Sequence, residues 1–341
     1  PRPVVAVHGA TDSPALEGAN YDDDSYNYPL AYVMGSTPRV ELTFGMMAIS
    51  STGYFIEAGY PVAGFDIRVE VVHEGLPVAA SGAIQPGGTA LLDLVALQAQ
   101  VGRQELEFEW RWQYRAEADG AWSAIPGATT IPHRFYTLLA EPNFKANATG
   151  TQYSGPWVEV CEYISSWSAA IGVAPVDAAS LTLVHVKGFF GQNSGIPTAL
   201  EGVIYDAYPL GGDGGANHYF SFANWRIDLS AWLNLHDHGI YVNCSDNMGA
   251  TTTMLSMLGV DNVRPVRLGP MTLKAIWGIG APAYTTNLWG SGHSFSYHHI
   301  VTDDDAVTVS DTCMQLDEDG SPNSTPGIPG ESLAAFSRAA W

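Results

Sequence analysis

The sequence predicts a protein of the α+β class, in which a β-sandwich is followed by a domain that mixes helices with an antiparallel sheet. Short alternating runs fill residues 39–140, helical apolar spacing begins after residue 141, and 36 Gly with 21 Pro provide many turns. A chain of 341 residues is long enough for two hydrophobic cores. We therefore divide it into an irregular arm (1–38), a sandwich (39–140) and a second domain (141–341).

The strands expected in the sandwich are rich in β-branched and aromatic residues and are separated by the turn sequences PGG, ADG and IPG. The clearest is LEFEWRWQY (106–114), which alternates strictly. Its apolar face consists of Leu106, Phe108, Trp110 and Trp112. Several such strands within about a hundred residues are typical of an Ig-like or fibronectin-like sandwich. The run ALLDLVALQAQV (90–101) fits either a strand or a helix.

The second domain opens with a helical pattern. PWVEVCEYISSWSAAIG (156–172) has an apolar stripe at helical spacing, and Gly172 closes it. SLTLVHVKGFF (180–190) is predicted to be a strand, and FANWRIDLSAWLN (222–234) a short helix. These elements precede the two segments that carry the candidate chemistry.

Composition excludes some classes of partner. With 14 basic against 35 acidic side chains the formal charge is −21, and phosphate binding requires clustered Lys and Arg, so nucleic acid is excluded. No apolar run reaches the roughly 18 residues of a membrane-spanning helix. Low lysine with abundant Gly, Ser, Thr, Asn, Tyr and Trp is typical of exported bacterial proteins, which predicts an extracellular, periplasmic or cell-surface location.

Three cysteines are too few for a disulfide scaffold. An odd number leaves at least one thiol unpaired. We expect a Cys161–Cys313 bridge with Cys244 left free.

A helix is predicted to begin at this third cysteine, in VNCSDNMGATTTMLSMLGV (242–260). Asn243 suits the N-cap, Cys244 then occupies the first helical position, and an acid at Asp246 suits the helix dipole. The inward face consists of Cys244, Met248, Thr251, Leu255 and Leu258, and Gly259 ends the helix. Backbone N–H groups of a first turn favour the thiolate and can stabilise an oxyanion. The alternative is a buried cysteine that acts as a small hydrophobe.

A nucleophile requires a base and an orienting group, and a later hairpin offers both. SFSYHHIVT and AVTVSDTCMQL read as two strands around the turn 303–305. Pairing would place Asp311 opposite Tyr297, His298 or His299, depending on the loop length. Cross-strand neighbours lie about 5 Å apart, so a histidine–carboxylate hydrogen bond is within reach. Cysteine, histidine and aspartate would then form a catalytic relay.

These segments resemble the transglutaminase-like superfamily of cysteine peptidases and amidases. VNCSDNMGATTTMLSMLGV is similar to that family's nucleophile helix, VRPVRL to the strand after it, and HHIVT with VTVSDTCMQLD to its His and Asp strands. The resemblance covers about residues 150–320 and implies a papain-like domain whose nucleophile helix packs on an antiparallel sheet. It assigns the nucleophile to Cys244, the acid to Asp311 and the base to His298 or His299. We favour His298, since a bulky apolar residue then follows at the family's usual distance.

The resemblance implies an exported thiol enzyme that acts on a protein or peptide substrate by hydrolysis, deamidation or amine transfer. The alternative is an extracellular structural or adhesive protein that self-associates or assembles into fibres, and retains the fold with little or no activity. The β-sandwich, the arm and the acidity fit that alternative.

No cofactor is predicted. LHDHG (235–239) lacks the ligand spacing of a zinc site. The acidic stretches YDDDSYN (21–27) and LDEDGSPN (316–323) carry oxygen ligands that calcium prefers, although neither matches an EF-hand loop, so calcium is retained as an alternative.

Overall fold

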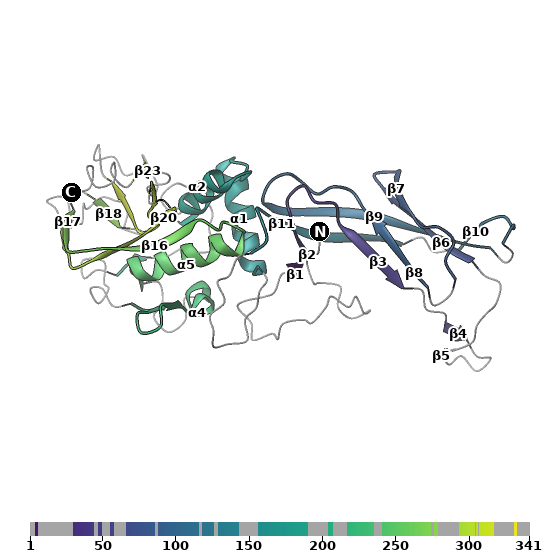
Figure 1. Cartoon of the computed structure of the whole chain (residues 1–341), viewed down its shortest axis with the longest axis horizontal. Helices are drawn as coiled ribbons and strands as arrows, with labels where there is room; N and C mark the ends of the chain where they lie inside the picture. The colour runs from purple at the N-terminus through teal and green to yellow at the C-terminus, as the bar shows by residue number, and fades with distance from the viewer. Residues whose placement is uncertain are drawn as a thin grey trace. The chain divides into compact units, whose positions relative to one another are not determined.

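The computed structural model in Figure 1 has the mixed α+β composition that the sequence predicts. It describes residues 4–5, 30–43, 47–49, 55–57, 66–85, 88–115, 118–125, 129–142, 156–189, 204–206, 217–234, 241–273, 276–278, 293–303, 305, 307–316 and 331–332. The chain forms two compact units. The first comprises Pro1–Pro3, Gly35–Gln98 and Gln104–Phe135, and the second Val4–Met34, Ala99–Arg103 and Tyr136–Trp341.

The first unit is built from antiparallel strand pairs. Its strands, two of which extend into the second unit, are β3 (Arg39–Thr43), β4 (Met47–Ile49), β5 (Phe55–Glu57), β6 (Asp66–His73), β7 (Leu76–Ala80), β8 (Thr89–Asp93), β9 (Gly102–Arg115), β10 (Ser123–Ala124) and β11 (Thr129–Leu138). β6 pairs with β7 and β9, β10 with β9, β3 with β8, and β4 with β5. Glu74 and Gly75 link β6 to β7 with φ of 51° and 78°, the left-handed backbone of a two-residue hairpin turn.

The long strand β9 confirms the alternation predicted for residues 106–114. Leu106, Phe108 and Trp110 are buried, whereas Trp112 is half-buried because burial decreases toward the end of the strand. The ambiguous run at 90–101 is a strand only as far as Asp93, and irregular backbone follows.

The predicted irregular arm is wrong in part, because Leu30–Val33 form strand β2, which pairs with β1 (Val4–Val5). Tyr32 of β2 is buried, so this end of the arm belongs to a packed structure.

Helices and short sheets make up the second unit. Its helices are α1 (Val158–Ile171), α2 (Ala178–Phe189), α4 (Leu229–Asn234) and α5 (Cys244–Met257). α1 ends at Gly172 with φ of 72°, as its sequence predicts. The largest fully buried side chains of the second unit are Tyr32, Tyr136, Leu138, Ile164, Trp167, Leu181, Trp232, Met254, Leu255 and Leu258. Among the helices that the structure describes, none combines the length and apolarity needed to span a bilayer.

One secondary-structure prediction in this unit is wrong, and another is correct only in part. The stretch at 180–190 is not a strand but the main part of α2, because Asp177 caps the helix by accepting the N–H of Ser180 (2.8 Å). Leu181, Val184 and His185 then recur on one buried face at helical spacing. The stretch at 222–234 is helical only in α4, and its first half belongs to the hairpin of β13 (Phe220–Ser221) and β14 (Arg226–Ile227).

A four-stranded antiparallel sheet supports the candidate site. Its order is β16 (Val263–Leu268), β20 (His298–Asp303), β21 (Thr308–Ser310) and β23 (Glu331–Ser332). Helix α5 packs against β16 and β20, as Figure 1 shows. The remaining strands form pairs: β12 (Ile204–Tyr205) parallel to β15 (Tyr241–Val242), and antiparallel β17 (Met271–Leu273) with β19 (His293–Phe295) and β18 (Ile276–Gly278) with β22 (Met314–Leu316).

The predicted Cys161–Cys313 bridge is wrong, because all three thiols are free and buried. Cys161 packs within α1 in the core, whereas the sulfur of Cys313 lies 3.7 Å from the side-chain nitrogen of Asn247 on α5. The two sulfurs therefore belong to different elements and serve as small core groups.

Candidate active site

Helix α5 begins at Cys244 in the way the sequence predicts. Asn243 is the N-cap, and its side-chain oxygen accepts the N–H groups of Ser245 (2.8 Å) and Asp246 (3.1 Å). The carboxylate of Asp246 in turn accepts the N–H of Asn243 (3.1 Å), which completes a reciprocal capping box. Only 4% of Cys244 is exposed, so the thiol is held on the inner side of a firmly fixed first turn.

His298 and Asp311 form a buried hydrogen bond of 2.7 Å between Nε2 and Oδ2. The other carboxylate oxygen of Asp311 accepts the backbone N–H groups of Cys313 (2.8 Å) and Met314 (3.1 Å). Because these amides hold the carboxylate from behind, Asp311 can direct only its second oxygen toward the imidazole. The ring of His298 is thus fixed through Nε2.

The strand register differs from the one predicted. The pairing of β20 with β21 ends at Val301 opposite Ser310, and continuing it would bring Asp311 opposite Ile300. The expected positions opposite Tyr297, His298 or His299 are therefore wrong. Since Ile300 and His298 point to the same face of β20, the Asp311 side chain still reaches the imidazole diagonally.

The thiol and the imidazoles influence each other's protonation. Burial raises the pKa of Cys244, but hydrogen bonding to His298 and then to His299 lowers it, with a net shift from 9.0 to about 6. Burial lowers the pKa of His298, but Asp311 and the thiol raise it, from 6.5 to about 10. At neutral pH this arrangement favours a thiolate beside an imidazolium.

One nitrogen of His298 remains for proton exchange with the thiol. Nε2 is committed to Asp311, whereas Nδ1 is buried and makes no hydrogen bond of standard geometry with the residues that the structure describes. A base that is oriented through one nitrogen and open at the other is the arrangement that thiol activation requires.

His299 occupies a different environment. Its Nδ1 lies 2.9 Å from the hydroxyl of Ser245, and its buried Nε2 makes no hydrogen bond of standard geometry with the described residues. Its side chain and backbone N–H also contribute to the lowered pKa of Cys244. The structure therefore brings all four predicted residues together and divides the histidines, with His298 bound to the carboxylate and His299 to the neighbouring serine.

Sequence reasoning missed Tyr205, which lies on β12 opposite Val242, two residues before Cys244. Tyr205 is buried; burial, followed by the charge of Cys244, raises its pKa. It is separated from Cys244 by almost forty positions. Because parallel pairing of two-residue strands has no sequence signature, no pattern could have identified it.

A second histidine–carboxylate pair lies at the same end of α5. His218 Nε2 is 3.1 Å from Asp206 Oδ2, and the Asp206 N–H donates to the carbonyl of Val242 (2.8 Å). Asp246 accepts the backbone N–H groups of His218, Tyr219 and Phe220, which fastens this segment to the start of the helix. These contacts position the start of α5.

Aromatic rings surround His299 on its other side. The rings of Tyr297, Phe222 and Trp225 lie 5.1, 5.5 and 6.2 Å from it, measured between centroids. The guanidinium of Arg267 stacks over Tyr297 at 4.4 Å and over Phe222 at 5.6 Å. We refer to Phe222, Trp225, Tyr297 and Arg267 as the aromatic–arginine face.

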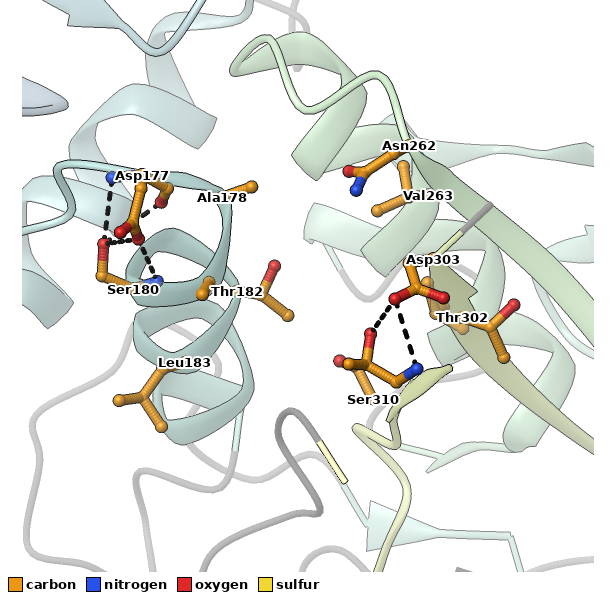
Figure 2. A pocket seen from close by; sticks show the side chains of 13 residues that line it. Asp177, Ala178, Ser180, Thr182, Leu183, Asn262, Val263, Thr302, Asp303 and Ser310 are labelled. Carbon is orange, nitrogen blue, oxygen red and sulfur yellow. Dashed lines mark hydrogen bonds between the residues drawn. The ribbon is translucent and has the colours of Figure 1, made fainter. Parts of the chain in front are cut away.

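A pocket of about 600 Å³ opens elsewhere in the same unit, as Figure 2 shows. Asp177 and Ser180 line one side, at the start of α2, and Thr302, Asp303 and Ser310 line the other. Its lining includes none of the four predicted residues. The candidate chemistry therefore lies in a buried cluster and not in this hollow.

Within the described part of the chain, no three His, Cys, Asp or Glu side chains converge in a way that could hold a metal ion. The zinc alternative at His236 and His238 lies outside the described residues, as do the acidic stretches considered for calcium at 21–27 and, apart from Leu316, at 316–323.

Comparison of the sequence with protein-family models finds no match, and comparison with curated proteins finds no relative.

Proposed function

We propose that the protein is a thiol enzyme of the transglutaminase-like type, which acts on peptide or carboxamide bonds through Cys244, His298 and Asp311. The single observation that carries the proposal is the His298–Asp311 hydrogen bond of 2.7 Å beside a thiol whose pKa is lowered to about 6. The Ig-like character of the first unit and an exported location are part of the same proposal.

In the proposed reaction the Cys244 sulfur attacks the carbonyl carbon, and the carbonyl oxygen takes up the negative charge. Asn243 already occupies the N–H groups of Ser245 and Asp246, so the amide of Cys244 itself is left in the first turn to stabilise that oxyanion. Protonated His298 then gives its Nδ1 proton to the leaving amine, and a thioester remains. Water resolves the thioester in a peptidase or deamidase, and an amine does so in a cross-linking enzyme.

Asp311 keeps the His298 ring oriented through this cycle and stabilises the imidazolium. It does so by hydrogen bonding and charge, without taking the proton itself. Tyr205 lies within electrostatic reach of the same sulfur and is a further group that can influence the thiolate.

Burial favours one alternative, a structural or adhesive protein in which the cluster is retained without turnover. Cys244, His298 and His299 are 4%, 0% and 1% exposed. A catalytic thiol must be reached by its substrate, whereas a core cluster need not be.

Alkylation distinguishes the two functions. Iodoacetamide at neutral pH, followed by mapping of the modified cysteine, should label Cys244 rapidly. Cys161 and Cys313 serve as internal controls, because burial raises the pKa of both thiols. His298→Ala should slow the labelling of Cys244 much more than His299→Ala, since only His298 is bound to Asp311. Slow labelling of Cys244 in the wild type would support the structural alternative.

A further inference from the structure

The aromatic–arginine face has features that the proposed chemistry does not use. Trp225 is 56% exposed and has a φ of 53°, in the left-handed region that a bulky side chain rarely adopts. The indole packs edge-on against Phe222, with ring centroids 6.0 Å apart. A strained backbone that presents a large apolar side chain to solvent is characteristic of a binding surface.

Arg267 differs from most of the described arginines in how its charge is used, although Arg68 also stacks over a ring, that of Trp122, and donates to the side chain of Gln113. Five described arginines hold a carboxylate, in the pairs Arg39–Asp93, Arg103–Glu162, Arg111–Glu109, Arg115–Asp66 and Arg134–Glu105. Among the described residues Arg267 has no carboxylate partner and only stacks on Tyr297 and Phe222. Stacking fixes the plane of the guanidinium and leaves its N–H edge available for a two-point contact with a carboxylate.

This face is connected to the thiol through a short chain of contacts. Arg267 is the strand partner of His299, and Tyr297 lies 5.1 Å from the His299 ring. His299 in turn contacts the hydroxyl of Ser245, the residue after Cys244. Burial raises the pKa of Tyr297, and the charges of both Cys244 and Arg267 act on it, so Tyr297 lies within electrostatic reach of the sulfur and the guanidinium.

We propose that Arg267 is a specificity-determining residue that binds a carboxylate of the substrate close to the carbonyl that Cys244 attacks. The aliphatic stem that bears this carboxylate lies on Tyr297, Phe222 and Trp225. The substrate class is therefore an acidic peptide or an acyl chain with a nearby carboxylate, in a protein whose net charge of −21 otherwise repels anions. This inference rests on the proposed function of Cys244.

Matched electrophilic peptides test the proposal in the full-length protein. Peptide vinyl sulfones that differ only in Glu against Gln, or in a terminal carboxylate against an amide, should label Cys244 at different rates. We expect the better acidic probe to react about tenfold faster than its neutral partner, the ratio expected of a charge-assisted contact. The two pairs of probes separate a side-chain carboxylate from a chain terminus. High salt should reduce the ratio.

Variants assign the preference to the guanidinium. Arg267→Gln should bring the acid-to-neutral ratio close to one, and Arg267→Lys should keep part of it, because lysine retains the charge without the planar fork. Arg264→Gln is the matched control, since Arg264 is an exposed arginine of the same strand that lies opposite Thr302 instead of His299. The ratio of acidic to neutral labelling rates in Arg264→Gln should match that of the wild type.

The iodoacetamide rate distinguishes the two kinds of failure, because this reagent carries no peptide for the face to recognise. Rapid alkylation of Cys244 with equal rates for acidic and neutral probes would overturn the role of Arg267 and leave the proposed function intact. A preference that survives unchanged in Arg267→Gln would do the same. A Cys244 that resists iodoacetamide would overturn the proposed function and this inference with it.

Discussion

His298 of β20 donates a hydrogen bond of 2.7 Å to Asp311, which follows the end of β21 and lies beyond the paired residues of the two strands. The bond depends on side chains, not on the backbone ladder. Two backbone amides hold the carboxylate, and neither side chain is more than 1% exposed. A buried imidazole that is fixed in this way through Nε2 presents Nδ1 as its only exchangeable position.

Removing the charge of Asp311 should disable the thiol. Burial alone would lower the pKa of His298, but the carboxylate of Asp311 raises it by more. Asp311→Asn should therefore leave the imidazole neutral and return the pKa of Cys244 toward its ordinary value. Each unit by which the pKa of the thiol rises above the working pH reduces the thiolate fraction about tenfold. We expect alkylation of Cys244 at pH 7 to slow by about tenfold or more, as measured by mass spectrometry.

Asp303→Asn is the control for this variant, because Asp303 lies in the same hairpin and, among the described residues, its carboxylate bonds Val307 and Thr308 of its own turn. It should destabilise the turn and leave the rate at Cys244 unchanged. Equal rates in the wild type and Asp311→Asn would contradict the role of the carboxylate.

Stability should depend on pH in a way that identifies Cys244. The folded pKa of Cys244 is lowered from 9.0 to about 6, so its contribution to stability is complete above pH 9 and is lost as the pH falls through 6. The folded pKa of His298 is raised from 6.5 to about 10, so its contribution is complete below pH 6.5 and is lost as the pH rises through 10. Between pH 6.5 and pH 9 stability therefore rises with pH because of Cys244 and falls with pH because of His298.

Cys244→Ser removes the pH dependence of the thiol and keeps the part of the His298 contribution that Asp311 supplies. The difference in free energy of unfolding between the wild type and this variant should therefore grow as the pH rises from 6 to 9, as measured by urea denaturation. A difference that stays constant over that range would show that the thiol does not ionise in the folded protein.

The helix start and the hairpin could be predicted because they depend on local chemistry. Asn243 and Asp246 form the capping box within four residues, and the turn after Asp303 separates two short strand-like runs. Their meeting in space, by contrast, results from the packing of α5 on β20. The resemblance to a known family suggested this arrangement, although periodicity alone did not.

The errors have the same physical origin. β-Branched residues in 180–190 favoured a strand, but the Asp177 cap and the packing of Gly188 against Trp167 stabilise a helix. The strand register failed because the amides after Asp311 fix its carboxylate outside the ladder. Tyr205 and Arg267 are joined to the site by strand pairing across long stretches of chain, which local patterns do not encode.

The N-cap of α5 should affect both stability and reactivity. Asn243→Ala removes the acceptor for two N–H groups and the contact of 2.7 Å with Asn217, so it should lower the free energy of unfolding by about 1–2 kcal/mol. It should also slow alkylation of Cys244, because the first turn loosens. Urea denaturation and labelling measure the two effects.

Asp177→Ala is the matched cap variant. It removes the N-cap of α2, so it should cost about 0.5–1 kcal/mol without changing the rate at Cys244. If both cap variants slowed alkylation equally, the effect would reflect general destabilisation and not the position of the thiol.

Gly188 should tolerate no side chain. A Cβ at this position would overlap the ring of Trp167, so Gly188→Ala should destabilise the protein by about 1–3 kcal/mol through overpacking. Gly269→Ala is the control, since no atom lies within 4 Å of the added carbon. Thermal unfolding should show a lower midpoint for the first variant and little change for the second.

The most direct test of the account is the pKa of Cys244, obtained from its alkylation rate as a function of pH. We expect a midpoint near 6 in the wild type and an upward shift in His298→Ala, because the imidazole that stabilises the thiolate is then lost. His299→Ala should produce the smaller shift. A wild-type midpoint at or above 9, unchanged by His298→Ala, would show that sulfur, imidazole and carboxylate do not act together.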